Sequence, residues 1–329
     1  MSATATGLQR SEGNRTSFTT VQIDVLRWLG AVGVDLFIQQ GDDQPPRLFH
    51  RAGTPISSQQ LAELKEAGLN QLLVLSDDFA LLSGDVLESL ESVLQQETVP
   101  GAQRFAALQL AVAVEVEQTL RAVDCGKFVS LADRIGNSLA GLMRSGTVVP
   151  QELFRIARHD FCTFTHVTNV ACYSVLLADR LGVRDATELR QIATGAMLHD
   201  LGKRMIPNSV IAKPGRLSPE ERELVQSHTQ RGYEELCGRS DMVFGQLMMV
   251  YQHHEHIDGN GYPVRILGDE IHPWAKLLAV VDVFDALTGK RNYRRPLSVQ
   301  AALDHLRNKA GKQFDREVVE CWIAAMQPA

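Results

Sequence analysis

The histidines of this chain are concentrated in one segment, and their distribution constrains the fold more than any other feature. Eight of the ten histidines lie between His159 and His272, in a stretch that from residue 151 onward has the pattern of helices and loops. Imidazole nitrogen is a common ligand of first-row divalent metal ions, so helices that share one ion must converge on it. The segment is expected to form an all-helical bundle around its histidines.

Helical periodicity and capping residues place five helices in this segment. Gly182 is of the residue type that follows a helix end, and it closes the helix that carries His166 near its start. A capping box at Ser218, with proline next to it, opens a helix expected to carry His228 at mid-length. The predicted helices cover residues 164–181, 187–199, a stretch from 218 onward, 241–255 and 274–287.

The last of these helices carries an acidic residue at its centre. Residues 274–287 are apolar on nearly all sides, so this helix is expected to be buried, yet Asp282 lies in its middle. A buried carboxylate without a partner strongly disfavours its charged form. Asp282 must therefore be paired, or it must bind a cation.

Several side chains of ligand type accompany Asp282. A single buried histidine is most often a core residue whose hydrogen bonds are satisfied within the protein. Seven nitrogen and oxygen donors from five helices exceed the needs of one tetrahedral ion and suit two octahedral ions bridged by Asp200, an arrangement that activates water for phosphoester displacement. The predicted ligands are His166, His199, Asp200, His228, His253, His254 and Asp282.

Two sequence motifs resemble those of a known family. The first is HDLGK at residues 199–203, and the second is HHE at residues 253–255 followed by DGNGYP at residues 258–263. In this order and spacing they look like the HD-GYP family, bacterial phosphodiesterases of the HD superfamily that hydrolyse cyclic di-GMP. The resemblance covers about residues 155–310 and includes residues 206–207, 212–215 and 282–288.

The resemblance implies an enzyme with two divalent metal ions, expected to be iron or manganese. A hydroxide held between the ions would attack a phosphodiester of cyclic di-GMP, giving linear pGpG and, after a second round, GMP. The ligands would divide into two sets that share one carboxylate: His166, His199, Asp200 and Asp282 for one ion, and Asp200, His228, His253 and His254 for the other.

Other residues of the motifs are expected to act on the substrate. Asp200 and Lys203 are the predicted catalytic residues, and Lys203 resembles the family lysine that assists proton transfer to the leaving oxygen. A basic cluster follows the helix over residues 274–287, and arginine forks suit phosphate. The predicted substrate-binding residues are Gly261, Tyr262, Pro263, Arg291 and Arg294.

The chain departs from the family pattern at two positions. Some members hold a third metal with a glutamate four residues before the first histidine, but here that position is Cys162, so two metals are expected. The arginine that usually follows the His-His-Glu triplet is His256. Asp285 is expected to support or cap and not to bind metal. The remaining histidines are expected not to be ligands: His50, His159, His256, His272 and His305.

The N-terminal third predicts a separate organisation. Residues 1–18 are small, polar and non-periodic, which indicates a disordered tail, and residues 19–100 predict a small α+β accessory module. This module is expected to contain a helix that begins at Ser57 or Ser58 and strands over residues 34–38, 47–50 and 71–75.

Residues 101–150 predict connecting helices, over about 105–120 and 128–143, ahead of the domain of residues 151–329. They could join the two parts, form a homodimer seam over residues 101–145, or pack onto the C-terminal domain. The fold class is mainly α, with an all-helical C-terminal bundle of HD type and a small α+β module.

Composition bears on partners and location. Lys and Arg number 33 against 39 Asp and Glu, so the formal net charge of −6 gives no overall attraction to a nucleic-acid polymer or a membrane. No apolar run approaches the roughly 20 residues that span a bilayer. Five scattered cysteines without a CxxC pair, and no signal peptide, indicate a cytoplasmic protein.

Two other functions remain open. The domain could be a weakly catalytic cyclic di-GMP receptor or a scaffold that binds a signalling protein through the Gly-Tyr-Pro loop. Loss of a ligand would favour that reading, and no predicted ligand is missing. A hydrolase of the same superfamily acting on another nucleotide is the third candidate, and the Gly-Tyr-Pro segment argues against it.

Overall fold

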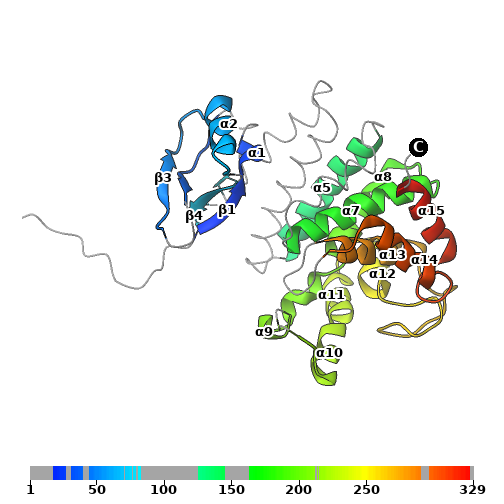
Figure 1. The fold of residues 1–329 in the computed structure, drawn as a ribbon. Helices are drawn as coiled ribbons and strands as arrows, with labels where there is room; N and C mark the ends of the chain where they lie inside the picture. Colours follow the sequence, from blue (N-terminus) through cyan, green and yellow to red (C-terminus); the bar gives the residue numbers. More distant parts are fainter. Residues whose placement is uncertain are drawn as a thin grey trace, which may run out of the picture. The chain divides into compact units, whose positions relative to one another are not determined.

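The computed structural model divides into two units, residues 1–86 and 87–329 (Figure 1). The expected fold class is confirmed, because the second unit is a helical bundle and the first a small α+β unit. The helix expected over residues 105–120 and most of the expected tail lie outside the described residues. The structure describes residues 18–26, 31–39, 44–69, 71–75, 77–78, 81–82, 125–144, 163–211, 213, 215–289 and 296–326.

The N-terminal unit is built on a four-stranded antiparallel sheet of order β1-β4-β2-β3. Strand β1 was not predicted, and its first residue, Phe18, was assigned to the tail. Its two central threonines obscure the apolar alternation, but all five residues pair with β4, and the Phe18 ring contacts Phe37 edge-on at 5.1 Å. The strands are β1 (Phe18–Gln22), β2 (Leu36–Ile38), β3 (Arg47–His50) and β4 (Gln71–Leu75).

Two helices accompany this sheet, α1 (Ile23–Leu26) and α2 (Ser58–Glu66). Helix α2 begins where the sequence predicted, because the Ser57 side chain accepts a hydrogen bond from Gln60 N in a complete capping box. Its two buried leucines face the core. The N-terminal unit thus has its own apolar core.

The second unit is a bundle in which α8 is surrounded by α5, α7 and α12 (Figure 1). Helix α5 packs onto α8 so closely that a Cβ on Gly136 would lie 2.8 Å from Thr194 Oγ1. Of the alternatives for the connecting helices, α5 therefore shows packing onto the C-terminal domain. The dimer seam stays a prediction. The helices are α5 (Cys125–Arg144), α7 (Thr163–Arg180), α8 (Ala186–Leu198), α9 (Asn208–Ile211), α10 (Pro219–Gln226), α11 (His228–Leu236), α12 (Phe244–Gln252), α13 (Pro273–Thr288), α14 (Val299–Lys309) and α15 (Arg316–Met326), with a 3₁₀ turn η1 (Leu201–Met205).

The helix opened by Ser218 ends earlier than the sequence predicted. We expected His228 at its mid-length, but α10 ends before Ser227 and His228 is the first residue of α11. Three consecutive side chains, those of Ser227, His228 and Thr229, each bond the backbone carbonyl three residues earlier. These local bonds compete with the helical ladder, which is interrupted at Ser227 although the backbone of this residue keeps helical angles. The interruption makes His228 the first residue of a separate helix.

Among the described residues, every helix is too short or too polar to span a lipid bilayer.

Helices α14 and α15 were not among the predicted elements. They pack against α13, where Trp322 of α15 contacts Phe284 at 5.1 Å between ring centroids. This packing buries one side of α13, the helix that carries Asp282.

Candidate metal centre

All seven predicted ligands lie within the described residues and converge from the ends of helices. Most belong to segments where a helix begins or ends, and the exception, Asp282, lies in the middle of the buried helix α13. Six of the seven side chains are at most 11% exposed; His254 is partly buried. Their elements are α7 for His166, the end of α8 for His199 and Asp200, the start of α11 for His228, the end of α12 for His253 and His254, and α13 for Asp282.

The first group consists of His166, His199 and Asp200, with one ligand atom of each within 4.8 Å of the others. His199 Nε2 lies 3.4 Å from Asp200 Oδ2. Asp282 joins this group, since its Oδ1 lies 3.2 Å from His166 Nε2 and 3.9 Å from His199 Nε2. These four residues are the set expected from the sequence at one metal.

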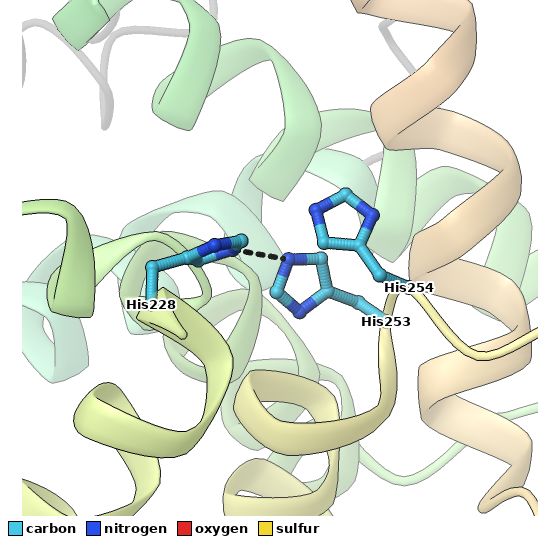
Figure 2. Close-up of side chains that lie close together, drawn as sticks. All are labelled: His228, His253 and His254. Carbon is cyan, nitrogen blue, oxygen red and sulfur yellow. Dashed lines mark hydrogen bonds between the residues drawn. The ribbon is translucent and has the colours of Figure 1, made fainter. Parts of the chain in front are cut away.

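The second group consists of His228, His253 and His254, whose ligand atoms also lie within 4.8 Å of one another. Figure 2 shows His228 approaching from one side and the adjacent His253 and His254 from the other. Asp200 lies between the groups, because its Oδ2 faces His199 and its Oδ1 is 3.4 Å from His228 Nε2. The bridging position expected for Asp200 is thus available to it.

In four of the histidine rings, the hydrogen bond made by Nδ1 determines that Nε2 is the nitrogen facing the cluster. Nδ1 of His199 lies 2.6 Å from Ala196 O, and Nδ1 of His228 lies 2.7 Å from Val225 O. A carbonyl only accepts hydrogen bonds, so Nδ1 carries the proton and the neutral ring presents the Nε2 lone pair to the cluster. His253 is held in the same way by the carbonyls of α12, and His166 by a carboxylate.

Unmatched polar atoms show that this donor set fits a cation. His199 Nε2 and Asp200 Oδ1 are buried and have no hydrogen-bond partner among the described residues. His228 Nε2 and His253 Nε2 lie 3.3 Å apart, and with both protons on Nδ1 neither nitrogen can donate to the other. Buried lone pairs that converge without donors are costly unless a metal ion accepts them.

The pKa values of several side chains in the cluster favour the protonation states that bind metal ions, which are neutral histidine and ionised aspartate. Burial lowers the pKa of His228 to about 4 and that of His254 to about 3, so both rings are neutral at pH 7. Burial acts to raise the pKa of Asp200, but the ammonium group of Lys203, 2.5 Å from its Oδ2, holds it well below its usual range. Asp200 is therefore an anion.

His166 differs from the other rings. Burial alone would lower its pKa, but hydrogen bonds to Asp282 and Asp285 raise it to about 9. Without a metal, a proton therefore occupies the space between His166 Nε2 and Asp282. A metal ion at this place has to displace that proton.

Two supporting residues surround His166. Asp285 Oδ2 lies 2.7 Å from His166 Nδ1, and Asn169 Nδ2 donates to Asp285 Oδ1 at 2.9 Å. Asp285 thus supports a predicted ligand and is not itself part of either group. Asn169 was missed, although its position one turn after His166 on α7 is a usable signal.

The Gly-Tyr-Pro loop lies against the second group. The ring of Tyr262 stacks on His254, with centroids 4.8 Å apart and planes at 30°. Gly261 approaches the backbone so closely that a Cβ there would lie 2.4 Å from His256 N. Pro263 is partly buried beside them. The loop therefore covers one side of the cluster.

Lys203 lies on η1, with its Nζ 2.5 Å from Asp200 Oδ2 and its side chain 34% exposed. His272 is the N-cap of α13, and His256 faces Asp258 at 3.9 Å; neither belongs to the two groups. Several expected site residues lie outside the described residues: Cys162, Arg291 and Arg294.

Known proteins resemble this chain over its C-terminal half. A family model described as HD domain matches residues 155–318. The cyclic di-GMP phosphodiesterase response regulator RpfG of Xanthomonas campestris is 37% identical over 179 residues, which cover 53% of this chain and 47% of that protein. The 3′3′-cGAMP-specific phosphodiesterase 2 of Vibrio cholerae is 38% identical over 160 residues, covering 48% of this chain and 30% of that protein.

The chain thus spans less than half the length of these two relatives. A solved structure of Bd1817, an HDG"Y"P protein from Bdellovibrio bacteriovorus, matches 95% of this chain and all of that chain with a TM-score of 0.68 at 17% identity, which supports the fold. With its HDLGK and HHE-DGNGYP motifs brought to one helical cluster of side chains that could hold metal ions, the chain belongs to the HD-GYP family of HD-domain proteins.

Proposed function

We propose that this chain is a metal-dependent phosphodiesterase that hydrolyses cyclic di-GMP. The observation that carries the proposal is the arrangement of Asp200, whose two oxygens face two separate groups of histidine nitrogens. A carboxylate between two ligand groups suits a pair of ions that acts on a phosphodiester. The names of the relatives support a cyclic dinucleotide as the substrate class.

Two divalent ions, iron or manganese, are the cofactors in this proposal. Bound ions would supply Lewis-acid stabilisation of the phosphoryl oxygens and an activated water. The two sets of ligands share Asp200, and each set contains buried nitrogen lone pairs that face inward. The sets are His166, His199, Asp200 and Asp282 for one ion, and Asp200, His228, His253 and His254 for the other.

The chain's own residues would bind the substrate and move a proton. Lys203 is partly exposed, and its ammonium group borders both the buried carboxylate and the surface, so it is placed to protonate the departing 3′ oxygen. Tyr262 offers an aromatic ring at the edge of the cluster for contact with the nucleotide. Gly261 and Pro263 shape this edge, and we keep Arg291 and Arg294 as proposed phosphate and guanine contacts.

The test is an assay of the protein loaded with iron or manganese, with products separated by chromatography. Cyclic di-GMP should be converted to pGpG or GMP, and the His199→Ala/Asp200→Ala variant should lose metal and turnover together. Asp304→Ala, an exposed carboxylate on α14, is the matched control and should keep both. Hydrolysis at the wild-type rate by the double variant contradicts the proposal.

Two other results would reassign the function within the same fold. Binding of cyclic di-GMP without turnover in either metal would indicate a receptor. Faster turnover of 3′3′-cGAMP than of cyclic di-GMP would change the substrate, as the name of the Vibrio relative suggests.

We also propose an organisation for the rest of the chain. Residues 19–100 would act as a regulatory module, residues 101–145 would offer a homodimer seam, and residues 151–329 would form the catalytic domain. The Gly-Tyr-Pro loop presents exposed apolar side chains at Val264 and Leu267, which would suit a signalling partner in the cytoplasm. Light scattering of the full chain tests the dimer.

A further inference from the structure

The carboxylate of Glu255 is buried next to the metal cluster but does not face it. Glu255 follows His254 directly in the chain and is 3% exposed. Its Oε1 accepts hydrogen bonds from Val264 N at 2.6 Å and Arg265 N at 2.9 Å, and its Oε2 lies 3.1 Å from Arg265 N. The buried charge is therefore satisfied by the backbone of the Gly-Tyr-Pro loop.

The backbone at these two amides has an unfavourable conformation. Arg265 has φ of 68°, in the left-handed region that side chains other than glycine rarely adopt. Two successive N–H groups that converge on one anion form a nest, and the anion offsets the strain of the conformation. Glu255 thus supplies the partner that this conformation needs.

The Gly-Tyr-Pro loop is also attached at Tyr262 to the residues that follow helix α12. Tyr262 N donates to His254 O at 3.1 Å, and its ring stacks on the His254 imidazole. Only Pro263 separates Tyr262 from the two amides bound by Glu255. The outer side of the loop contributes little burial, since Val264 is 51% and Leu267 55% exposed. The Glu255 carboxylate is therefore a buried anchor for the part of the loop that directly follows the tyrosine.

We propose that Glu255 is a positioning residue that fixes Tyr262 against His254 for contact with the substrate. This inference rests on the proposed function, because it takes Tyr262 as a substrate contact. It assigns Glu255 a role that is separate from metal binding, since both carboxylate oxygens are turned to the loop.

Glu255→Gln tests the proposal with little change of volume, because the amide loses the charge and one acceptor oxygen. Glu270→Gln is the matched control, since Glu270 is an exposed carboxylate that accepts from Leu267 N in the same loop. Hydrogen exchange followed by mass spectrometry reports the Val264 and Arg265 amides directly. Glu255→Gln should speed their exchange about tenfold or more, and Glu270→Gln should leave them unchanged.

The kinetic readout separates positioning from general damage. In the metal-loaded full chain, Glu255→Gln should raise KM for cyclic di-GMP about tenfold with kcat changed less than about threefold, because uniform binding is lost. Metal content should stay at the wild-type level. In a Tyr262→Ala background, Glu255→Gln should have no further effect on KM.

Several outcomes overturn the proposal. If amide exchange at Val264 and Arg265 is unchanged in Glu255→Gln, the carboxylate does not hold the loop. If exchange is faster but KM is unchanged, Glu255 does not position Tyr262 for the substrate. An equal effect of Glu255→Gln with and without Tyr262 removes the route through the tyrosine. A wild-type protein that turns over no cyclic di-GMP refutes the proposed function instead. The exchange result still decides whether Glu255 holds the loop, and the Kd for the dinucleotide then replaces KM.

Folding is checked by the melting temperature of each variant. Should Glu255→Gln fail to fold, Glu255→Gln/Arg265→Gly carries the same test, because glycine adopts the positive φ without strain. Arg265→Gly alone is then the reference, and the same changes in exchange and KM are expected relative to it.

Discussion

His166 Nδ1 and Asp285 Oδ2 lie 2.7 Å apart and join helices α7 and α13 inside the bundle. The carboxylate takes the outer nitrogen of the ring, so Nε2 points toward Asp282 at 3.2 Å. Carboxylates that hold metal-binding histidines in this way fix the ring orientation and raise its basicity. Asn169 in turn holds the other oxygen of Asp285.

Asp285→Asn should weaken metal binding without removing a proposed ligand. The amide leaves His166 without its anionic partner, and the expected loss in metal affinity is about 10–100-fold. Calorimetric titration of the metal-free protein with Mn²⁺ measures this loss. Asp304→Asn, on the surface of α14, should leave the affinity unchanged. Equal affinities for wild type and Asp285→Asn would show that the pair is structural only.

The helices that carry the site could be predicted from local sequence because their signals are local. The helix expected over residues 187–199 is observed as α8 (Ala186–Leu198) with its cap at Asp185, and that over residues 274–287 as α13 (Pro273–Thr288). Periodicity and capping depend on residues close together in the chain. The convergence of seven ligand-type side chains followed from the same reasoning combined with the family motifs.

The features that were missed depend on contacts between distant residues or on side-chain hydrogen bonds. Strand β1 is defined by its pairing with β4 about 50 residues later, which no local pattern reports. The break before His228 arises from three side chains that bond backbone carbonyls, and Ser or Thr within a helix only sometimes does so. Asn169 acquires its role only when α7 meets α13.

Gly202→Ala should damage the site through packing. A Cβ at Gly202 would lie 1.9 Å from His228 O, so η1 and α11 could not keep their present distance. Overpacking at such a contact lowers the free energy of unfolding by about 1–3 kcal/mol or more, and His228 should move away from Asp200. Urea unfolding and metal content by mass spectrometry check both effects.

Gly141→Ala is the matched control for this substitution. Gly141 lies in helix α5 with no atom within 4 Å of a built Cβ, so alanine should raise the free energy of unfolding by about 0.5–1 kcal/mol. Wild-type stability and metal content in Gly202→Ala would mean that the close approach is not required.

The metal-free protein should be most stable near pH 6.5. His228 and His254 have pKa values lowered to about 4 and about 3, so the unfolded chain binds more protons below its usual histidine pKa of about 6.5 and stability falls as the pH drops from there toward 4. His166 has its pKa raised to about 9, so its contribution is complete below about 6.5 and is lost as the pH rises to 9. Urea unfolding in chelator between pH 4 and 9 measures this dome, and a stability that rises steadily to pH 9 contradicts it.

Lys203→Met should separate proton transfer from metal binding. The ammonium group lies 2.5 Å from Asp200 Oδ2 but supplies no lone pair to either group of ligands, so the variant should keep its metals. Removal of a general acid lowers kcat about 10²–10⁴-fold, and the loss should be smaller for a substrate whose leaving group needs no proton, such as bis(p-nitrophenyl) phosphate. Lys213→Met is the control, because Lys213 pairs with Glu221 at 2.6 Å and neither residue belongs to the two groups of ligands. A Lys203→Met variant that keeps both its metals and wild-type turnover of cyclic di-GMP removes the proton-donor role, and an equal loss with both substrates assigns the lysine to charge balance at Asp200 instead.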